Sequence, residues 1–96
     1  MIQSFGNRLA EELFGDINSA ATRKLAADVR RAAQRKLQYL HAAGKLQDLA
    51  VPPGNRLEAL KGDLKGFYSI RINEQWRVMF KWRDGAATSV QIVDYH

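Results

Sequence analysis

Three short runs of alternating apolar and polar residues in the second half of the chain constrain its fold more than any other feature. The runs cover about residues 67–72, 75–82 and 87–93, and the pairs Asn73-Glu74 and Asp84-Gly85 separate them. Alternation with a period of two is typical of β-strands, and Asp-Gly between two such runs is typical of a hairpin turn. The sequence therefore predicts an antiparallel meander of three strands.

The same alternation divides the side chains of this sheet between two faces. The face expected to pack on the helices carries Tyr68, Ile70, Ile72, Trp76, Val78, Phe80, Trp82, Val90 and Ile92. The opposite, polar face carries Ser69, Arg71, Arg77, Met79, Lys81, Arg83, Ser89 and Gln91. Like charges on neighbouring strands weaken strand pairing. Two interpretations of the basic face therefore stay open, a solvated surface and a binding site for an anion.

Helical patterns fill the first half of the chain. A short strand is expected over residues 1–5, followed by a helix over 8–14 that Asn7 caps and Gly15 ends. After a loop over 16–21, apolar residues every three or four positions predict a long helix over about 22–43. These residues are Leu25, Val29, Ala33, Leu37 and Leu40.

The long helix is expected to stop at Gly44, and its other faces are rich in arginine and lysine. His41, near its end, is interpreted as a cation favoured by the helix dipole, with no function. Val51-Pro52-Pro53-Gly54 breaks the chain between the helical half and the strand half. Neither half can bury a core alone, so residues 1–96 are expected to form one α+β domain, with the N-terminal strand and two helices packed on one face of the sheet.

Composition narrows the classes of function. The 96 residues include 15 Lys+Arg against 10 Asp+Glu, a net charge of +5, which favours nucleic acid, an acidic protein or anionic lipid as partner. The chain has no cysteine and only two histidines, His41 and His96, so we expect chemistry without a metal or other cofactor. No signal peptide and no apolar run long enough for a membrane span is visible, which predicts a cytoplasmic location without membrane contact.

The stretch from residue 55 to 96 contains the groups that metal-free RNA cleavage requires: a base, a cation for the phosphorane and a proton donor. Glu58 is a candidate base, Lys61 and Arg77 are candidate cations, and Tyr95 or His96 can carry protons. Asp94 can orient its neighbours or act as a base. A structural interpretation stands beside this one: Glu58 and Lys61 as a solvated pair, and Asp94-Tyr95-His96 as a loose tail.

Three ordered blocks of the chain carry a resemblance to a known family. They are Arg56-Leu57-Glu58-Ala59-Leu60-Lys61-Gly62-Asp63, Tyr68-Ser69-Ile70-Arg71-Ile72-Asn73-Glu74-Gln75-Trp76-Arg77 and Val93-Asp94-Tyr95-His96. In composition and spacing they resemble the HigB branch of the RelE toxin superfamily. The similarity covers essentially the full length and is tightest over residues 52–96.

This resemblance implies a RelE-like microbial RNase fold and a toxin that cleaves mRNA in the ribosomal A site. It also implies a HigA-type helix-turn-helix antitoxin, through which alone the toxin would meet operator DNA. The family's catalytic positions match Lys61, Arg77, Asp94, Tyr95 and His96. The products would be a 2′,3′-cyclic phosphate and a 5′-hydroxyl, with further RNA contacts from Arg71, Lys81, Arg83 and Arg56.

One position departs from the pattern, because some HigB toxins have histidine where this chain has Glu58. Imidazole titrates near neutral pH, whereas a free glutamate has a pKa of about 4.3. Three roles for Glu58 stay open: a base, a group that steers Lys61, or a sign of weak activity. The alternatives to an enzyme are a catalytically silent RelE-like module for nucleic-acid binding or co-repression, and a domain that only binds an acidic partner.

Overall fold

A computed structural model of the chain describes residues 1–95, so the predicted role of His96 lies outside the described residues. Its helices are α1 (Arg8–Phe14), α2 (Ala20–Arg23) and α3 (Ala27–Ala42). Its strands are β1 (Glu58–Ala59), β2 (Phe67–Arg71), β3 (Trp76–Arg83) and β4 (Ala86–Asp94). Three short 3-10 helices, η1 (Leu46–Ala50), η2 (Pro53–Asn55) and η3 (Gly62–Leu64), lie between α3 and β2.

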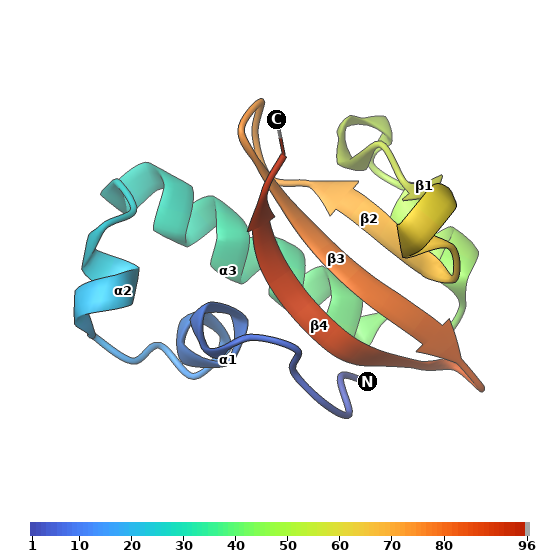
Figure 1. The fold of residues 1–96 in the computed structure, drawn as a ribbon, viewed down its shortest axis with the longest axis horizontal. Coiled ribbons are helices and arrows are strands. Elements are labelled where there is room, and N and C mark those ends of the chain that lie inside the picture. Colours follow the sequence, from blue (N-terminus) through green and yellow to red (C-terminus); the bar gives the residue numbers. More distant parts are fainter. Residues whose placement is uncertain (96) are drawn as a thin grey trace.

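The strands form one antiparallel sheet in the order β1-β2-β3-β4 (Figure 1). The predicted meander is therefore confirmed, and β1 adds a two-residue strand that the alternation did not predict. The predicted N-terminal strand is reduced to two isolated parallel bridges, which join Ile2 to Ala87 and Phe5 to Val90. The first residues thus run along the free edge of β4, where they satisfy part of its backbone.

A β-bulge changes the alternation in β4. Met79 pairs with Gln91, but Lys81 pairs with Thr88. Two residues along β3 therefore correspond to three residues along β4, so β4 contains one extra residue. Ser89 has a positive φ of 52°, and the extra residue turns both Ala87 and Val90 into the core. Strict alternation would have buried Thr88 in place of Ala87.

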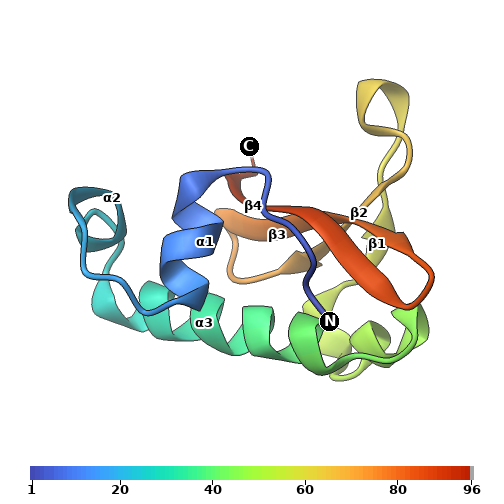
Figure 2. The ribbon, with the colours of Figure 1, turned by 90° about the horizontal axis from the view of Figure 1, so that it is seen from below.

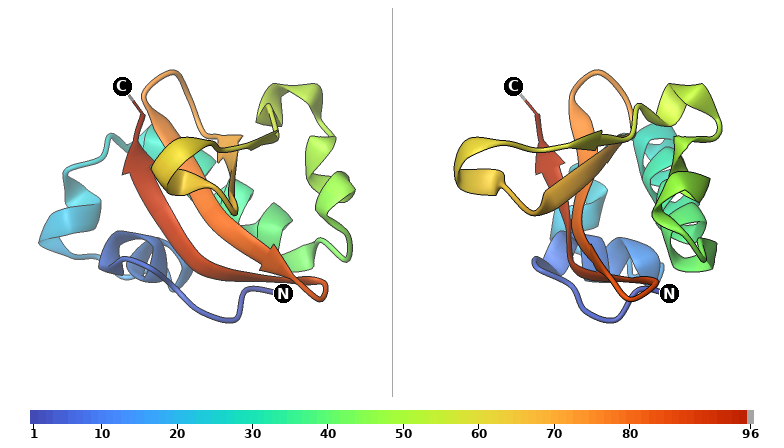
Figure 3. Two further views of the ribbon diagram at one scale, coloured as in Figure 1. Left: turned by 45° about the vertical axis from the view of Figure 1, so that its right-hand side comes forward. Right: turned by 90° about the vertical axis from the view of Figure 1, so that its right-hand side faces the viewer.

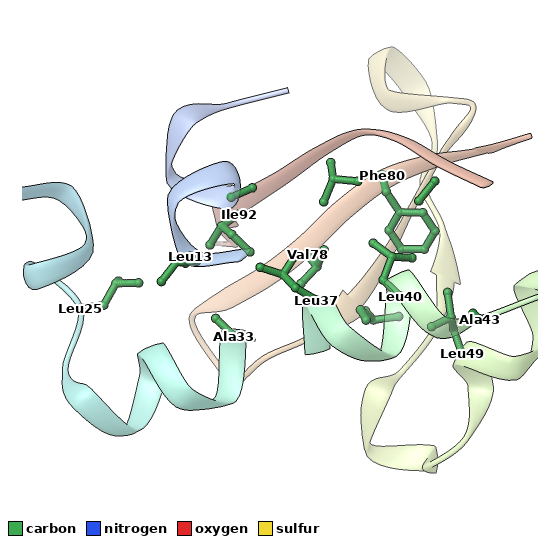
Figure 4. Packing of buried hydrophobic residues seen from close by; sticks show 14 residues of the cluster. Leu13, Leu25, Ala33, Leu37, Leu40, Ala43, Leu49, Val78, Phe80 and Ile92 are labelled. Carbon is green, nitrogen blue, oxygen red and sulfur yellow. The ribbon is translucent and has the colours of Figure 1, made fainter. Parts of the chain in front are cut away.

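The helices and the sheet enclose one core. Figure 2 shows α3 running beneath the sheet, and Figure 4 shows leucines from α1 and α3 meeting side chains of β3 and β4. The largest fully buried apolar side chains are Phe80, Leu13, Leu37, Leu40, Leu49, Ile70, Val78 and Val90. The Asn7 side chain accepts from the Ala10 N–H, 3.0 Å away, which confirms the predicted cap of α1.

The predicted long helix over 22–43 is wrong in its first turns. Helix α2 begins earlier, because Ser19 and Thr22 form a reciprocal capping box. The chain then leaves the helical path, which turns Leu25 into the core, and α3 starts at Ala27. The apolar stripe itself is confirmed within α3, where Ala33, Leu37 and Leu40 are all fully buried.

His41 has a different role from the one predicted. Its Nδ1 accepts a hydrogen bond from the Ile2 N–H at 3.1 Å, and its ring lies 5.1 Å from the Phe14 ring. His41 fastens the N-terminal segment to α3.

The proline-rich joint is fixed to α3 by one buried amide. The Asn55 side chain is fully buried, and its Nδ2 donates to the carbonyl oxygens of Leu49 and Val51 at 3.1 and 3.3 Å. Its Oδ1 accepts from the Lys36 ammonium. These bonds set the point from which the chain rises into β1. Within residues 1–95, none of the helices is both long enough and apolar enough to cross a membrane.

Candidate active site

The hairpin from β1 to β2 covers the sheet face that is turned away from α3. In the right-hand view of Figure 3 it curls over one side of the sheet while α3 covers the other. Gly62 and Gly66 have φ values of 65° and 99°, which residues with a side chain rarely adopt, so they permit the tight path through η3. The hairpin brings Glu58 opposite Ser69 in the β1–β2 register.

This hairpin shows that the second sheet face, predicted as polar, is not solvated in its middle part. Ser69 and Met79 are only 1% and 7% exposed, since the hairpin shields the middle of that face. Beside them is a pocket of about 300 Å³, whose walls are mostly apolar. It is lined by Leu60, Leu64, Ser69, Met79, Val93, Asp94 and Tyr95.

Arg77 is at the centre of the candidate site. Its Nη1 lies 2.8 Å from Glu58 Oε1 and donates to Ser69 Oγ at 3.3 Å. Its Cζ lies 4.3 Å from the centre of the Tyr95 ring, a cation–π contact. The Arg77 side chain is 12% exposed and that of Glu58 is 45% exposed. Residues of β1, β2 and the C-terminal end thus hold one cation in a fixed place.

The end of the chain is tied to the β2–β3 turn. Asp94 is the last residue of β4, and its Oδ2 accepts from the side-chain amide of Gln75 at 3.1 Å. The Tyr95 N–H donates to the Gln75 carbonyl oxygen at 2.6 Å. The interpretation of the terminus as a loose tail is therefore wrong for Asp94 and Tyr95.

Two other candidate cations are Arg71 on β2 and Lys61 in the β1–β2 hairpin. Arg71 is paired with Arg77 in the β2–β3 register, so it adds positive charge on the same face. Lys61 is exposed and precedes η3. Since Glu58 pairs with Arg77, the predicted Glu58–Lys61 pair is not formed within residues 1–95.

The outer cations are farther away. Lys81 lies over the Phe67 ring, 5.0 Å from its centre. Arg83 is six residues along β3 from Arg77, about 20 Å at the usual strand rise, and its only ion pair within residues 1–95 is with Asp84 at 3.9 Å. Arg56 is exposed, in a left-handed conformation with φ 47°. The structure does not bring Arg83 to the candidate site. The RNA contacts predicted for Arg56, Arg71, Lys81 and Arg83 stay predictions.

Ser69 and Gln75 were missed as site residues. Ser69 was assigned only to the polar face, although its place opposite Glu58 makes it a partner of Arg77. The β1–β2 register carries that information, and two residues of β1 give no alternation from which to read it. Among residues 1–95, no group of three or more histidine, aspartate and glutamate side chains is placed to hold a metal ion.

Comparison with known proteins identifies the family of the chain. Residues 3–96 match the family described as RelE-like toxin of type II toxin–antitoxin system HigB. Toxin HigB-1 of Vibrio cholerae is 39% identical over 92 residues, which cover 96% of this chain and 95% of that protein. Endoribonuclease HigB of Proteus vulgaris is 33% identical over 100 residues and is matched over the full length of both chains.

Solved structures resemble the fold. The YoeB dimer of Staphylococcus aureus has a TM-score of 0.61 at 20% identity, over 99% of this chain and 97% of that one. A mutant form of YafQ from Escherichia coli has a TM-score of 0.59 at 15% identity, over 98% and 93%. These likenesses show the fold, and the family match gives the class, a small RelE-like toxin.

The chain belongs to the HigB family of toxins of type II toxin–antitoxin systems. The predicted fold and the predicted class, a HigB-type endoribonuclease toxin, are confirmed by these matches. Membership of a type II system also gives the toxin an antitoxin as partner.

Proposed function

We propose that this toxin cuts mRNA in the A site of the ribosome, by a reaction that uses no metal ion. The observation that carries the proposal is the placement of Arg77, a nearly buried guanidinium held by Glu58, Ser69 and Tyr95. Such a fixed cation suits a reaction whose transition state gains negative charge, because it needs little reorganisation when the charge develops. The Proteus vulgaris relative is named as an endoribonuclease, which supports RNA as the substrate.

The reaction is a transesterification within the RNA. The ribose 2′-oxygen loses its proton and attacks the adjacent phosphorus, and a phosphorane forms. The bond to the 5′-oxygen then breaks, and that oxygen takes a proton. The products are a 2′,3′-cyclic phosphate and a 5′-hydroxyl, so no water is consumed in the cut.

Arg77 stabilises the phosphorane in this scheme, with Lys61 on the hairpin as the second cation. The bonds that Arg77 makes within residues 1–95 use a single nitrogen, Nη1. A guanidinium has five N–H donors in a planar fork, so Nε and Nη2 remain for two phosphate oxygens. Arg71, opposite Arg77, adds attraction for the backbone.

Glu58 acts as a positioning residue. Its carboxylate is already bonded to the cation that the phosphate needs, and its distance from Arg77 matches a charge-assisted hydrogen bond. It keeps the guanidinium aligned along β1 and balances the charge until RNA arrives. The proton transfers fall to Asp94, Tyr95 and His96, of which Tyr95 lies against Arg77.

Dependence on the ribosome follows from how little this site offers to free RNA. Its described residues hold one cation, Arg77, in a fixed place, and the carboxylate of Glu58 is already paired with that cation. Intramolecular attack is fast only when the 2′-oxygen is aligned with the phosphorus. The decoding site would supply that alignment. The toxin would act in the cytoplasm, where ribosomes are, and its antitoxin would be a HigA-type helix-turn-helix protein that alone contacts operator DNA.

The test compares translated and untranslated mRNA. Wild-type toxin is added to a purified translation system with an mRNA that carries a start codon and with a matched mRNA that lacks one, and cut sites are mapped by primer extension. We expect in-frame cuts in the first mRNA only. Equal cutting of both would refute ribosome dependence, and an absence of cuts in both would leave a catalytically silent RelE-like module.

A further inference from the structure

A second hollow lies far from Arg77, between the α1–α2 connection, α2 and the first turns of α3. It has a volume of about 440 Å³, and apolar atoms of Leu13, Ile17 and Ala27 form part of its lining. Ile17 is 50% exposed, unusual for an isoleucine in a chain with so few exposed large apolar residues. We call this hollow the α2 cleft.

The wall of the α2 cleft is held by polar contacts. The Ile17 carbonyl accepts from Thr22 Oγ1 at 3.0 Å, and Thr22 is 3% exposed. Gln34 Nε2 donates to Asp16 Oδ1 at 2.9 Å and to the Leu13 carbonyl at 3.3 Å. The exposed Ile17 is thus fixed in place by the chain around it.

Three arginines, Arg23, Arg30 and Arg31, line the same cleft. Arg23 donates to the Asn18 amide oxygen at 3.3 Å, and Arg30 donates to the Thr22 carbonyl at 3.5 Å. Within residues 1–95, none of the three forms an ion pair. Their charge outweighs that of Asp16, the only acidic residue among the described residues of the lining.

We propose that the α2 cleft is the docking site for an acidic, amphipathic segment of the antitoxin. An apolar side chain of that segment would cover Ile17 and Leu13, and its carboxylates would meet Arg23, Arg30 and Arg31. Charge complementarity of this kind speeds encounter and selects the partner. The docking site rests on membership of a type II toxin family, and only the route of inhibition rests on the proposed action at the ribosome.

RNA fits this cleft less well than a peptide. Single-stranded RNA is bound through aromatic side chains that stack on its bases, and none of the described lining residues is aromatic. Asp16 would also repel a phosphate, whereas a peptide can donate an N–H to it.

The position of the cleft separates it from the catalytic face. Figure 2 shows α2 at one end of the molecule, next to the start of α3, while the β1–β2 hairpin projects at the other end. Arg77 and Glu58 lie on the sheet face that α3 does not cover. A segment in the α2 cleft would leave the Glu58–Arg77 pair open, so inhibition would come from the bulk of the bound antitoxin, which keeps the toxin out of the ribosome.

The test is a reversal of charge that spares the fold. Arg23→Glu/Arg31→Glu removes two arginines of the lining but keeps Arg30, which holds the Thr22 carbonyl. Arg31 is exposed near the N-terminal end of α3, where an acidic side chain is well tolerated. The matched control, Arg8→Glu/Arg35→Glu, changes the net charge equally at exposed positions outside the cleft.

The probe is the cognate antitoxin of this type II system, and its affinity is measured by titration calorimetry. We expect the cleft variant to bind about a hundredfold more weakly, with the control close to wild type. Raising the salt concentration should weaken the wild-type complex and leave that of the cleft variant nearly unchanged. Cutting of translated mRNA by the cleft variant alone should match wild type.

Unchanged affinity of the cleft variant would overturn the proposal. So would a variant that binds antitoxin normally but no longer cuts mRNA, because the cleft would then serve the ribosome. If the glutamate variant does not fold, Arg23→Gln/Arg31→Gln replaces it, and wild-type affinity of that variant counts equally against the proposal. A wild-type toxin that cuts nothing, with affinity still lost in the cleft variant, would refute the RNase proposal alone.

Discussion

Glu58→Gln tests whether Glu58 positions Arg77 or takes the proton from the 2′-hydroxyl. Glutamine keeps the shape and an oxygen that can accept from Arg77 Nη1, but it removes the negative charge and cannot act as a base. The two roles therefore predict different losses of rate.

The magnitude follows from the geometry of the pair. The charge centres of such a pair are about 4 Å apart, and two unit charges at that separation attract by about 4 kcal/mol at an effective dielectric constant near 20. Glu58 is 45% exposed, so solvent screening reduces the contribution to about 1 kcal/mol. We expect the melting temperature to fall by about 4–8 °C, and the rate of cutting to fall about fivefold if Arg77 is less firmly held.

The assay is single-turnover cleavage on programmed ribosomes across a range of pH, with thermal unfolding measured in parallel. A positioning role predicts a small loss of rate and a pH profile of unchanged shape. A general base contributes about 10²- to 10⁴-fold. A loss of that size in a folded Glu58→Gln protein, with the acidic limb of the profile altered, would refute the positioning role.

Two further predictions concern stability. Asn7→Ala removes the α1 cap and two hydrogen bonds to the Ile92 backbone. Urea denaturation should show that the free energy of unfolding falls by about 2–3 kcal/mol. The control Asn18→Ala, at an exposed position, should change it by less than about 0.5 kcal/mol. Burial and the neighbouring Arg35 lower the pKa of Lys36 from 10.5 in the folded protein. The folded state then binds this proton more weakly than the unfolded chain, so the stability of wild type relative to Lys36→Met should rise with pH between the folded pKa and 10.5. Below the folded pKa the difference should stay constant at its lower value, because both states are then protonated. A pH-independent difference between the two proteins would contradict this.

Local patterns in the sequence predicted much of the fold because they report on neighbours in the chain. Asn7 capped α1 as expected, and the three strands of the meander lie where the alternation placed them. The errors came from contacts that a local pattern does not contain. The bulge at Ser89 depends on how β4 meets β3, and the break at Leu25 depends on the core that receives its side chain.

For the candidate site, too, the sequence predicted which residues take part but not which of them are paired. The sequence identified Glu58, Arg77 and Tyr95 as candidates, and the structure brings all three into contact. It could not show that Glu58 pairs with Arg77, because a two-residue strand gives no alternation from which to read a register. Ser69 was missed although the predicted meander placed it on the same face as Arg77, because the bond between them depends on the register of β2 against β3.

The most direct measurement of the central claim is the activity of Arg77→Ala on translated mRNA, with Arg8→Ala, an exposed arginine of α1, as the control. Cut sites and the chemistry of the new ends are determined together. Wild type and Arg8→Ala should leave 2′,3′-cyclic phosphates and 5′-hydroxyls at A-site codons, and a folded Arg77→Ala should cut at least about a hundredfold more slowly. Cutting by Arg77→Ala at the wild-type rate would contradict the account.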